Sequence, residues 1–160
     1  MPSPPAHSLR IALESDAENL ARLINRAFVS ERFFSDEDRT SPNGVREYLK
    51  KGVFILAEDA GELIGCVYLE PRGNRFYLGL LSVETSRQGR GMGSFLMKAA
   101  EEHCRAYGTV GIDLQVVDVR KDLPAYYRRF GYTQTGTAPF PEHVKTKIPC
   151  RFLILSKELK

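Results

Sequence analysis

The sequence predicts a single-domain α/β fold of the α+β type, in which a sheet of about six to seven strands is flanked by about four helices. Three observations lead to this fold class. A chain of 160 residues holds one domain with a sizeable core, but not separate domains for two ligands. Several segments of strand length alternate apolar and polar residues, and other segments repeat apolar residues at helical spacing.

The N-terminus differs in composition from the rest of the chain. Residues 1–8 carry three prolines and no apolar run, so we expect a flexible tail before a domain that spans residues 9–160. This composition fits neither a signal peptide nor a membrane anchor. No later segment approaches the roughly 18 uninterrupted apolar residues of a membrane-spanning helix. We therefore expect a soluble, cytoplasmic protein with no membrane partner.

The domain begins with a strand and a helix. Residues 9–13 alternate apolar and polar side chains, which is typical of a half-buried strand. Ser15 and Glu18 have the spacing of a capping box, and the apolar residues that follow favour a helix over residues 16–29. Residues 30–40 mix aromatic and acidic side chains, as either a substrate-facing loop or a solvated connection would.

A second helix and three strands follow. Ser41 can cap a helix over residues 42–51, which a glycine ends. Residues 53–57 and 63–69 are strand-like and are joined by turn-forming residues, so they should make a hairpin. Residues 76–83 are apolar on both alternating faces, which predicts a central strand covered on both sides.

The C-terminal half continues with helices and strands. Residues 92–107 keep apolar residues at helical spacing and predict a long helix. Residues 110–116 alternate as a strand does, and residues 123–130 indicate a short helix. Residues 132–136 and 151–156 should be the last strands, separated by a loop that contains three prolines.

Charge and cysteine content argue against two function classes. A formal net charge of +3 is too mild for a nucleic-acid surface, although it suits a small ligand that carries phosphates. Cys66, Cys104 and Cys150 are odd in number and far apart in the sequence. This spacing argues against a disulfide framework and against a paired-cysteine zinc site. We expect no nucleic-acid partner and no metal.

A glycine-rich segment lies between the central strand and the long helix, and it consists of Gln88, Gly89, Arg90, Gly91, Met92, Gly93 and Ser94. A helix start leaves amide hydrogens unpaired and carries partial positive charge, so this turn can cradle a pyrophosphate. Arg87 and Arg90 add positive charge nearby. The alternative is a tight turn in which glycine only supplies positive backbone angles.

This segment resembles the acyl-CoA motif of the GNAT N-acetyltransferase superfamily, which reads Q/R-x-x-G-x-G/A. Gln88, Gly91 and Gly93 fill its defined positions, directly after the expected central strand. Thr85 stands where the family often has proline, a departure that leaves the motif itself intact.

A second motif follows in the order that the family has. The run YYRRFGY, from Tyr126 to Tyr132, is similar to the family's F-Y-x-x-x-G-F/Y. The likeness covers residues 53–136, about half of the chain. It implies an N-acetyltransferase domain with a mixed, mostly antiparallel and strongly twisted sheet. It also implies that the cofactor enters where the strands near Val83 and Val110 diverge.

The resemblance implies roles for individual residues. Main-chain groups of Leu81 and Val83, with Ser82 between them, would pair with the pantetheine arm of acetyl-CoA like an added strand. Backbone amides from Gln88 through Ser94 would hold the pyrophosphate. Tyr127 would be the general acid that protonates the departing thiolate. The alternative for Tyr127 is an aromatic packing role in the core.

The implied activity is acetyl-CoA-dependent N-acetyl transfer, in which a primary amine of a small molecule or peptide attacks the thioester directly. Main-chain amides of the central strand would stabilise the oxyanion, and neither a metal nor a covalent enzyme intermediate is required. We expect the loops around Phe33 and Pro139 to select the acceptor. Members of the superfamily often dimerise, so a homodimer is compatible with the resemblance.

Arg120 departs from the family pattern, because it replaces an asparagine that often precedes the tyrosine of the second motif. Arg120 or Lys121 could instead meet a CoA phosphate. Arg128 and Arg129 are further candidates for the 3'-phosphate, and an ordinary solvated role is their alternative.

The position of the general base is a second departure from the family pattern. Tyr77 aligns with a strand glutamate that some family members use, so the usual carboxylate is absent. Glu70, Glu84 and Asp113 are substitutes by location only, and His103 lies on the apolar face of the long helix, where packing is the expected role. We assign no base from the sequence.

Two other functions stay open. The absence of the strand carboxylate is compatible with a non-catalytic acyl-CoA sensor or an interaction module. A dinucleotide-binding protein is the remote alternative, because residues 89–94 nearly fit G-x-G-x-x-G/A and Asp113 follows about twenty residues later. The final glycine of that motif is missing.

Overall fold

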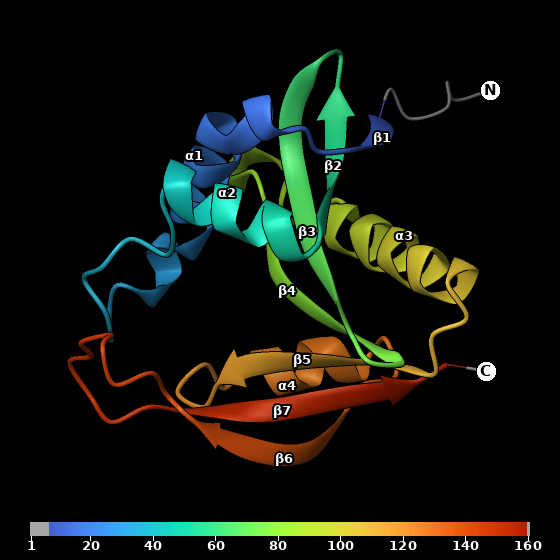
Figure 1. Cartoon of the computed structure of the whole chain (residues 1–160). Helices are drawn as coiled ribbons and strands as arrows, with labels where there is room; N and C mark the ends of the chain where they lie inside the picture. The colour runs from blue at the N-terminus through green and yellow to red at the C-terminus, as the bar shows by residue number, and fades with distance from the viewer. Residues whose placement is uncertain (1–6, 160) are drawn as a thin grey trace.

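The computed structural model describes residues 7–159, which form a seven-stranded mixed sheet with helices on both faces (Figure 1). The strands lie in the order β1-β2-β3-β4-β5-β7-β6. Their bounds are β1 (His7–Ile11), β2 (Val53–Asp59), β3 (Glu62–Arg72), β4 (Arg75–Val83), β5 (Gly111–Val117), β6 (Thr133–Pro139) and β7 (Arg151–Glu158). Neighbouring strands are antiparallel except β4 and β5, which run parallel. The predicted mixed, mostly antiparallel sheet is confirmed.

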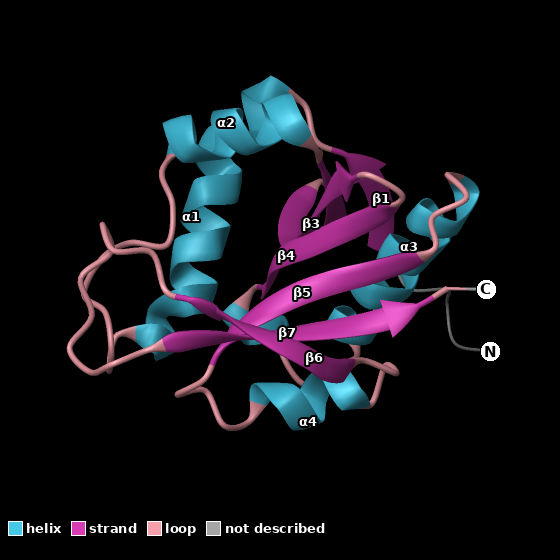
Figure 2. Ribbon diagram, turned by 60° about the horizontal axis from the view of Figure 1, so that its bottom comes forward, coloured by secondary structure: helices cyan, strands magenta, loops and turns pink. Residues whose placement is uncertain are grey.

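The helices of the described residues divide between the two faces, and their bounds are α1 (Ala17–Ala27), α2 (Pro42–Lys51), α3 (Met92–Ala106) and α4 (Leu123–Arg128). α1 and α2 pack on one face through a core that includes Leu20 and Phe54. α3 and α4 pack on the other face, around Leu78 and Leu96. Figure 2 shows α4 on the opposite side of the sheet from α1 and α2. As predicted, the central strand β4 is covered on both faces. None of these helices is long and apolar enough to cross a lipid bilayer.

Local sequence explains two of these elements. Ser41 caps α2 by accepting the N–H of Gly44 at 3.0 Å, and Pro42 occupies the first helical position, as predicted. β2 and β3 form the predicted hairpin. Its turn residues Ala60 and Gly61 have φ angles of 51° and 83°, the positive values that a tight two-residue hairpin turn requires.

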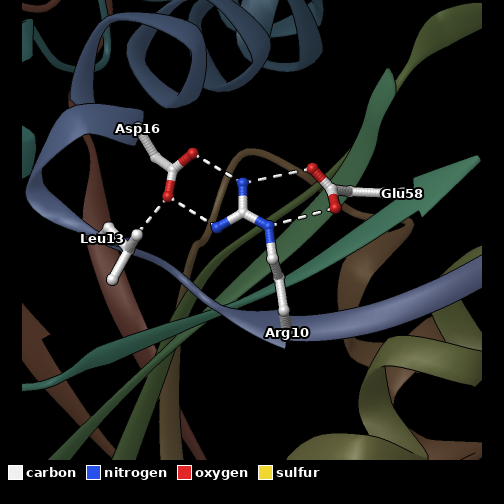
Figure 3. Close-up of polar contacts among 4 residues, drawn as sticks. All are labelled: Arg10, Leu13, Asp16 and Glu58. Atoms are coloured by element: carbon white, nitrogen blue, oxygen red, sulfur yellow. Dashed lines mark hydrogen bonds and ion pairs between the residues drawn. The ribbon is translucent and has the colours of Figure 1, made fainter. Parts of the chain in front are cut away.

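The start of α1 differs from the prediction. Its N-cap residue is Asp16 rather than Ser15, so the predicted capping box is wrong. The Asp16 carboxylate accepts the N–H of Leu13 at 2.7 Å and is bound by two nitrogens of Arg10 at 2.7 and 2.8 Å (Figure 3). Arg10 also donates to Glu58 on β2. The Asp16 side chain therefore ties the start of α1 to the sheet and makes no cap hydrogen bond to the helix.

Other element boundaries also differ from the prediction. β1 begins at His7, so two residues of the predicted tail belong to the sheet, while residues 1–6 of that tail lie outside the described residues. α1 ends at Ala27, and a 3-10 turn (Phe28–Glu31) replaces the predicted end of the helix. β6 extends to Pro139, because a strand at the sheet edge tolerates a missing N–H donor.

β4 contains a β-bulge that opens the sheet. Leu80 has a positive φ of 53°, and the register against β3 shifts between Cys66 and Tyr68. The extra residue reverses the alternation of side chains, so Leu78 faces the core under α3 whereas Leu80 faces the core under α1. Pairing between β4 and β5 ends at Leu78 and Leu114. Beyond this point the two strands separate.

Candidate functional site

The separation of β4 and β5 creates a cleft of about 620 Å³, which we call the central cleft. Its walls come from the C-terminal halves of β4 and β5, the segment after α1, α4, and the loop between β6 and β7. That loop lies beside the segment after α1 (Figure 1), where Lys147 donates its N–H to the carbonyl of Phe34 at 2.6 Å. The cleft therefore combines residues from distant parts of the chain.

Beyond Leu78, the edge of β4 that faces away from β3 has no strand partner in the described part of the chain. Glu84 donates its N–H to Ile64 on β3 at 2.8 Å. Because main-chain groups alternate along a strand, those of Leu81 and Val83 point away from β3, toward the open edge. Ser82 is buried, with a side chain that points into the fold. The edge can therefore offer main-chain groups to an extended ligand.

The glycine-rich segment forms the turn from β4 into α3. Gly89 and Gly91 have φ angles of 79° and 81°, and an added Cβ at either position would meet no atom within 4 Å. Gln88 closes the turn by donating its side-chain amide to the carbonyl of Val83 at 3.2 Å. The N-cap residue Gly91 has no side chain, so it leaves the first amides of α3 uncapped. The positive φ angles satisfy the tight-turn alternative, and the open space and free amides also suit an anion.

Two residues of this segment contact the protein itself. The side chain of Met92 is buried in the core beneath α3. At Gly93, an added Cβ would lie 2.2 Å from the hydroxyl oxygen of Tyr126. Tyr126 belongs to α4 and packs edge-on against Tyr127, with ring centroids 5.1 Å apart. Gly93 thus allows α4 to approach the start of α3. Ser94, the last residue of the segment, is exposed.

The arginines near the turn differ in what they contact. Arg87 is paired with Asp59 at 2.6 Å, so its charge is already used within the fold. Arg90 is exposed beside the glycines. Arg128 and Arg129 are exposed on and after α4, and Arg129 lies over the ring of Tyr126. Arg90 is therefore the cation of the turn that is best placed to meet an anionic ligand.

Arg120 contacts carboxylates of the protein. Its guanidinium binds Asp122 at 3.0 and 3.1 Å, and it reaches Ser30 and Glu31 at 3.3 Å. These contacts join the turn after β5 to the turn after α1. Lys121 beside it is exposed.

Tyr127 lines the central cleft from α4 and is 9% exposed. Burial raises the pKa of its hydroxyl well above the ordinary value, and the nearby Tyr126 and Tyr77 act in the same direction. The hydroxyl is therefore protonated at neutral pH and can donate a hydrogen bond. Its ring also packs against Tyr132, so Tyr127 combines a cleft position with a packing role.

The carboxylates that the sequence suggested as substitutes for the general base do not line the cleft. Each is bound by an arginine: Glu70 by Arg72, Glu84 by Arg26 and Asp113 by Arg75. Tyr77 does line the cleft. As predicted, His103 is a packing residue, in contact with Phe76 and Tyr107.

Glu31 is a cleft residue that the sequence analysis missed. It lies in the 3-10 turn after α1 and lines the central cleft with its side chain 17% exposed. Burial raises the pKa of this carboxyl above its ordinary value, although Arg120 and Arg39 act in the opposite direction. One sequence signal could have found it: Ile24, Phe28 and Glu31 continue the inward helical face beyond the end of α1.

Comparison with known proteins identifies the family. The model of the acetyltransferase (GNAT) family matches residues 17–132. The chain belongs to the GNAT family. A mycothiol acetyltransferase from Propionibacterium freudenreichii is 26% identical over 140 residues, which are 79% of this chain and 44% of that protein. The chain spans less than half the length of this curated relative.

Solved structures of GNAT proteins have the same fold. An IAA acetyltransferase from Bacillus cereus has a TM-score of 0.73 at 21% identity, over 96% of this chain and 99% of that chain. A ribosomal-protein-alanine N-acetyltransferase from Brucella melitensis has a TM-score of 0.76 at 19% identity, over 95% and 99%. The dinucleotide-binding alternative is wrong, because residues 7–159 form this GNAT sheet rather than repeated parallel strand-helix-strand units.

Proposed function

We propose that the chain transfers the acyl group of acetyl-CoA, or of a close acyl-CoA relative, to the nitrogen of a primary amine in a small molecule or peptide. The turn from Gln88 to Ser94 carries this proposal. It combines open space beside Gly89 and Gly91, uncapped amides at the start of α3 and the exposed Arg90. These features favour the binding of a diphosphate. The acetyltransferase names of the matched relatives support acetyl transfer.

The pantetheine arm and the thioester of the cosubstrate fit the edge of β4 and the central cleft, which lie next to the turn. Main-chain groups of Leu81 and Val83, on either side of Ser82, face the free edge of β4, which an extended pantetheine arm can join as an added strand. From the turn, this edge leads into the central cleft, which Tyr127 lines. The open edge thus connects the anion-binding turn to the cleft.

The chemistry then depends on polarised groups in the cleft. The thioester supplies the acyl group to the attacking amine. Main-chain amides of β4 can stabilise negative charge on the acyl oxygen, and the Tyr127 hydroxyl can donate to the leaving sulfur. The pKa of a thiol, about 8.5, lies below that of tyrosine, about 10, so hydrogen bonding assists departure before full proton transfer.

The test separates binding from turnover. Calorimetry with acetyl-CoA measures association, and release of free CoA across a panel of primary amines measures transfer. The Tyr127→Phe variant should turn over about 100-fold more slowly while binding acetyl-CoA as tightly as the unchanged protein. Failure to bind acetyl-CoA would refute the proposal. Tight binding without turnover on any amine would favour the acyl-CoA sensor.

A further inference from the structure

Among the carboxylates that line the central cleft, Glu31 has a distinct environment. Glu37 and Asp38 are exposed, and Asp38 is paired with Arg32. Glu31 is largely buried, and Arg120, whose side chain is 19% exposed, holds it. A carboxylate shielded from water interacts more strongly with a cationic ligand than an exposed carboxylate does.

The contact with Arg120 leaves part of the Glu31 carboxylate free. Arg120 reaches Oε2 at 3.3 Å, and no side chain of the described residues donates to Oε1. Because Arg120 also binds Asp122 through two nitrogens, its guanidinium is fixed from the far side. One oxygen of Glu31 is therefore oriented by the protein while the other can receive a ligand.

Aromatic side chains continue from Glu31 along the same cleft. Phe34 donates its N–H to the carbonyl of Glu31 at 3.1 Å, and its ring meets that of Phe140 at 6.5 Å. Phe140 stacks on Phe152 of β7 at 4.8 Å. All three rings line the cleft and form what we call the aromatic wall. This surface suits an apolar group next to a charged one.

We propose that Glu31, oriented by Arg120, receives the amino group of the acceptor and takes its proton, and that the acceptor carries an apolar body that rests on the aromatic wall. This inference rests on the proposed function. In this proposal, the turn after α1 supplies the carboxylate of the cleft. β4 contributes Tyr77 to the same cleft, which is not a carboxylate. It also gives Arg120 a role as a positioning residue.

The reaction removes two protons from the acceptor nitrogen. The protonated amine gives one proton to the Glu31 carboxylate, which releases it to solvent. The nitrogen lone pair then forms the bond to the acyl carbon, and the carbon–sulfur bond breaks with its electron pair on sulfur. The second proton lost by nitrogen balances the proton that the sulfur gains through Tyr127. The products are an amide and a free thiol.

Charged groups around Glu31 set the expected pH dependence. Arg120 and Arg39 lower the pKa of Glu31, whereas burial and Asp122 raise it, with a net upward shift. The cleft also holds Tyr127 and the following rim groups: Arg32, Glu37, Asp38 and His143. Because the base must be deprotonated, kcat/KM should rise as pH rises through the pKa of Glu31. Removal of the Arg120 charge should move this rise to higher pH.

The experiment uses phenethylamine as the acceptor and phenethyl alcohol as a neutral analogue of the same shape. Glu31→Gln should lower kcat/KM for phenethylamine about 100-fold and abolish the acidic limb of its pH profile. It should weaken phenethylamine binding about tenfold and leave inhibition by phenethyl alcohol unchanged. Glu102→Gln, which removes an exposed charge of α3 outside the cleft, is the control variant and should change none of these quantities.

Two further variants test the arrangement. Arg120→Gln should shift the acidic limb to higher pH, which a purely structural role would not do. Phe140→Ala should raise KM for phenethylamine more than for ethylamine. Calorimetry with acetyl-CoA distinguishes between failure of the two proposals. If the unchanged protein does not bind acetyl-CoA, the proposed function is refuted. Normal acetyl-CoA binding with kcat/KM of Glu31→Gln within twofold of the unchanged protein, or an unmoved pH profile in Arg120→Gln, overturns the role of Glu31.

Discussion

The close approach of α4 to the start of α3 makes Gly93→Ala an informative perturbation. An added Cβ would lie 2.2 Å from the hydroxyl oxygen of Tyr126. A comfortable contact is about 3.5 Å, so the tyrosine must move by about 1 Å. Overpacking of this kind costs about 1–3 kcal/mol, whereas replacing glycine by alanine in a helix stabilises it by at most about 1 kcal/mol. We expect a net loss of about 1 kcal/mol in the free energy of unfolding.

The same substitution should have the opposite effect in a Tyr126→Phe background. Without the hydroxyl, the new Cβ would lie 3.6 Å from the ring carbon Cζ, which is an ordinary contact. The helix preference of alanine then acts alone, so Gly93→Ala should stabilise the Tyr126→Phe protein by up to about 1 kcal/mol.

Equilibrium unfolding in urea of the four proteins of this cycle measures the coupling between the two positions. We expect a coupling energy of about 1–3 kcal/mol, because a single steric contact accounts for the difference between the backgrounds. Tyr126 packs on Tyr127, so the alanine variant should also lose turnover, and the double variant should recover part of it. Equal effects of Gly93→Ala in both backgrounds would refute the reasoning.

Three further predictions concern stability and reactivity. Gly91→Ala forces a side chain onto a φ angle of 81°, and thermal unfolding should show a loss of about 1–2 kcal/mol; an unchanged melting temperature would contradict this. The hydrogen bond from Arg10 lowers the pKa of Asp16, so its stabilisation is present above the unfolded pKa and lost as pH falls through the folded one. Urea unfolding at several pH values from neutral to acid should therefore show that the free energy of unfolding falls less with decreasing pH in Asp16→Asn than in the unchanged protein. Iodoacetamide at mildly alkaline pH should modify Cys150, which is partly exposed, before the two buried cysteines, and mass spectrometry of the native protein checks the order.

Local sequence was sufficient for much of the fold. The cap of α2 and the tight turn between β2 and β3 depend on residues that are neighbours in the chain. The alternation of apolar residues also located each strand to within a few positions. The predicted capping box failed because the N-cap position falls one residue later, at Asp16, whose carboxylate binds Arg10 on β1 instead of capping the helix. A contact with the sheet therefore decided which of two neighbouring residues precedes the helix.

The sequence by itself determined the order of elements, the family motif and the glycine turn, because backbone preferences and helix-start chemistry depend on adjacent residues. Only the tertiary structure decided the shape and charge of the central cleft. The bulge at Leu80 separates β4 from β5, and the pair formed by Glu31 and Arg120 joins residues 89 positions apart. Such contacts follow from how the helices and strands pack, since burial and pairing of a side chain depend on neighbours that chain order does not specify.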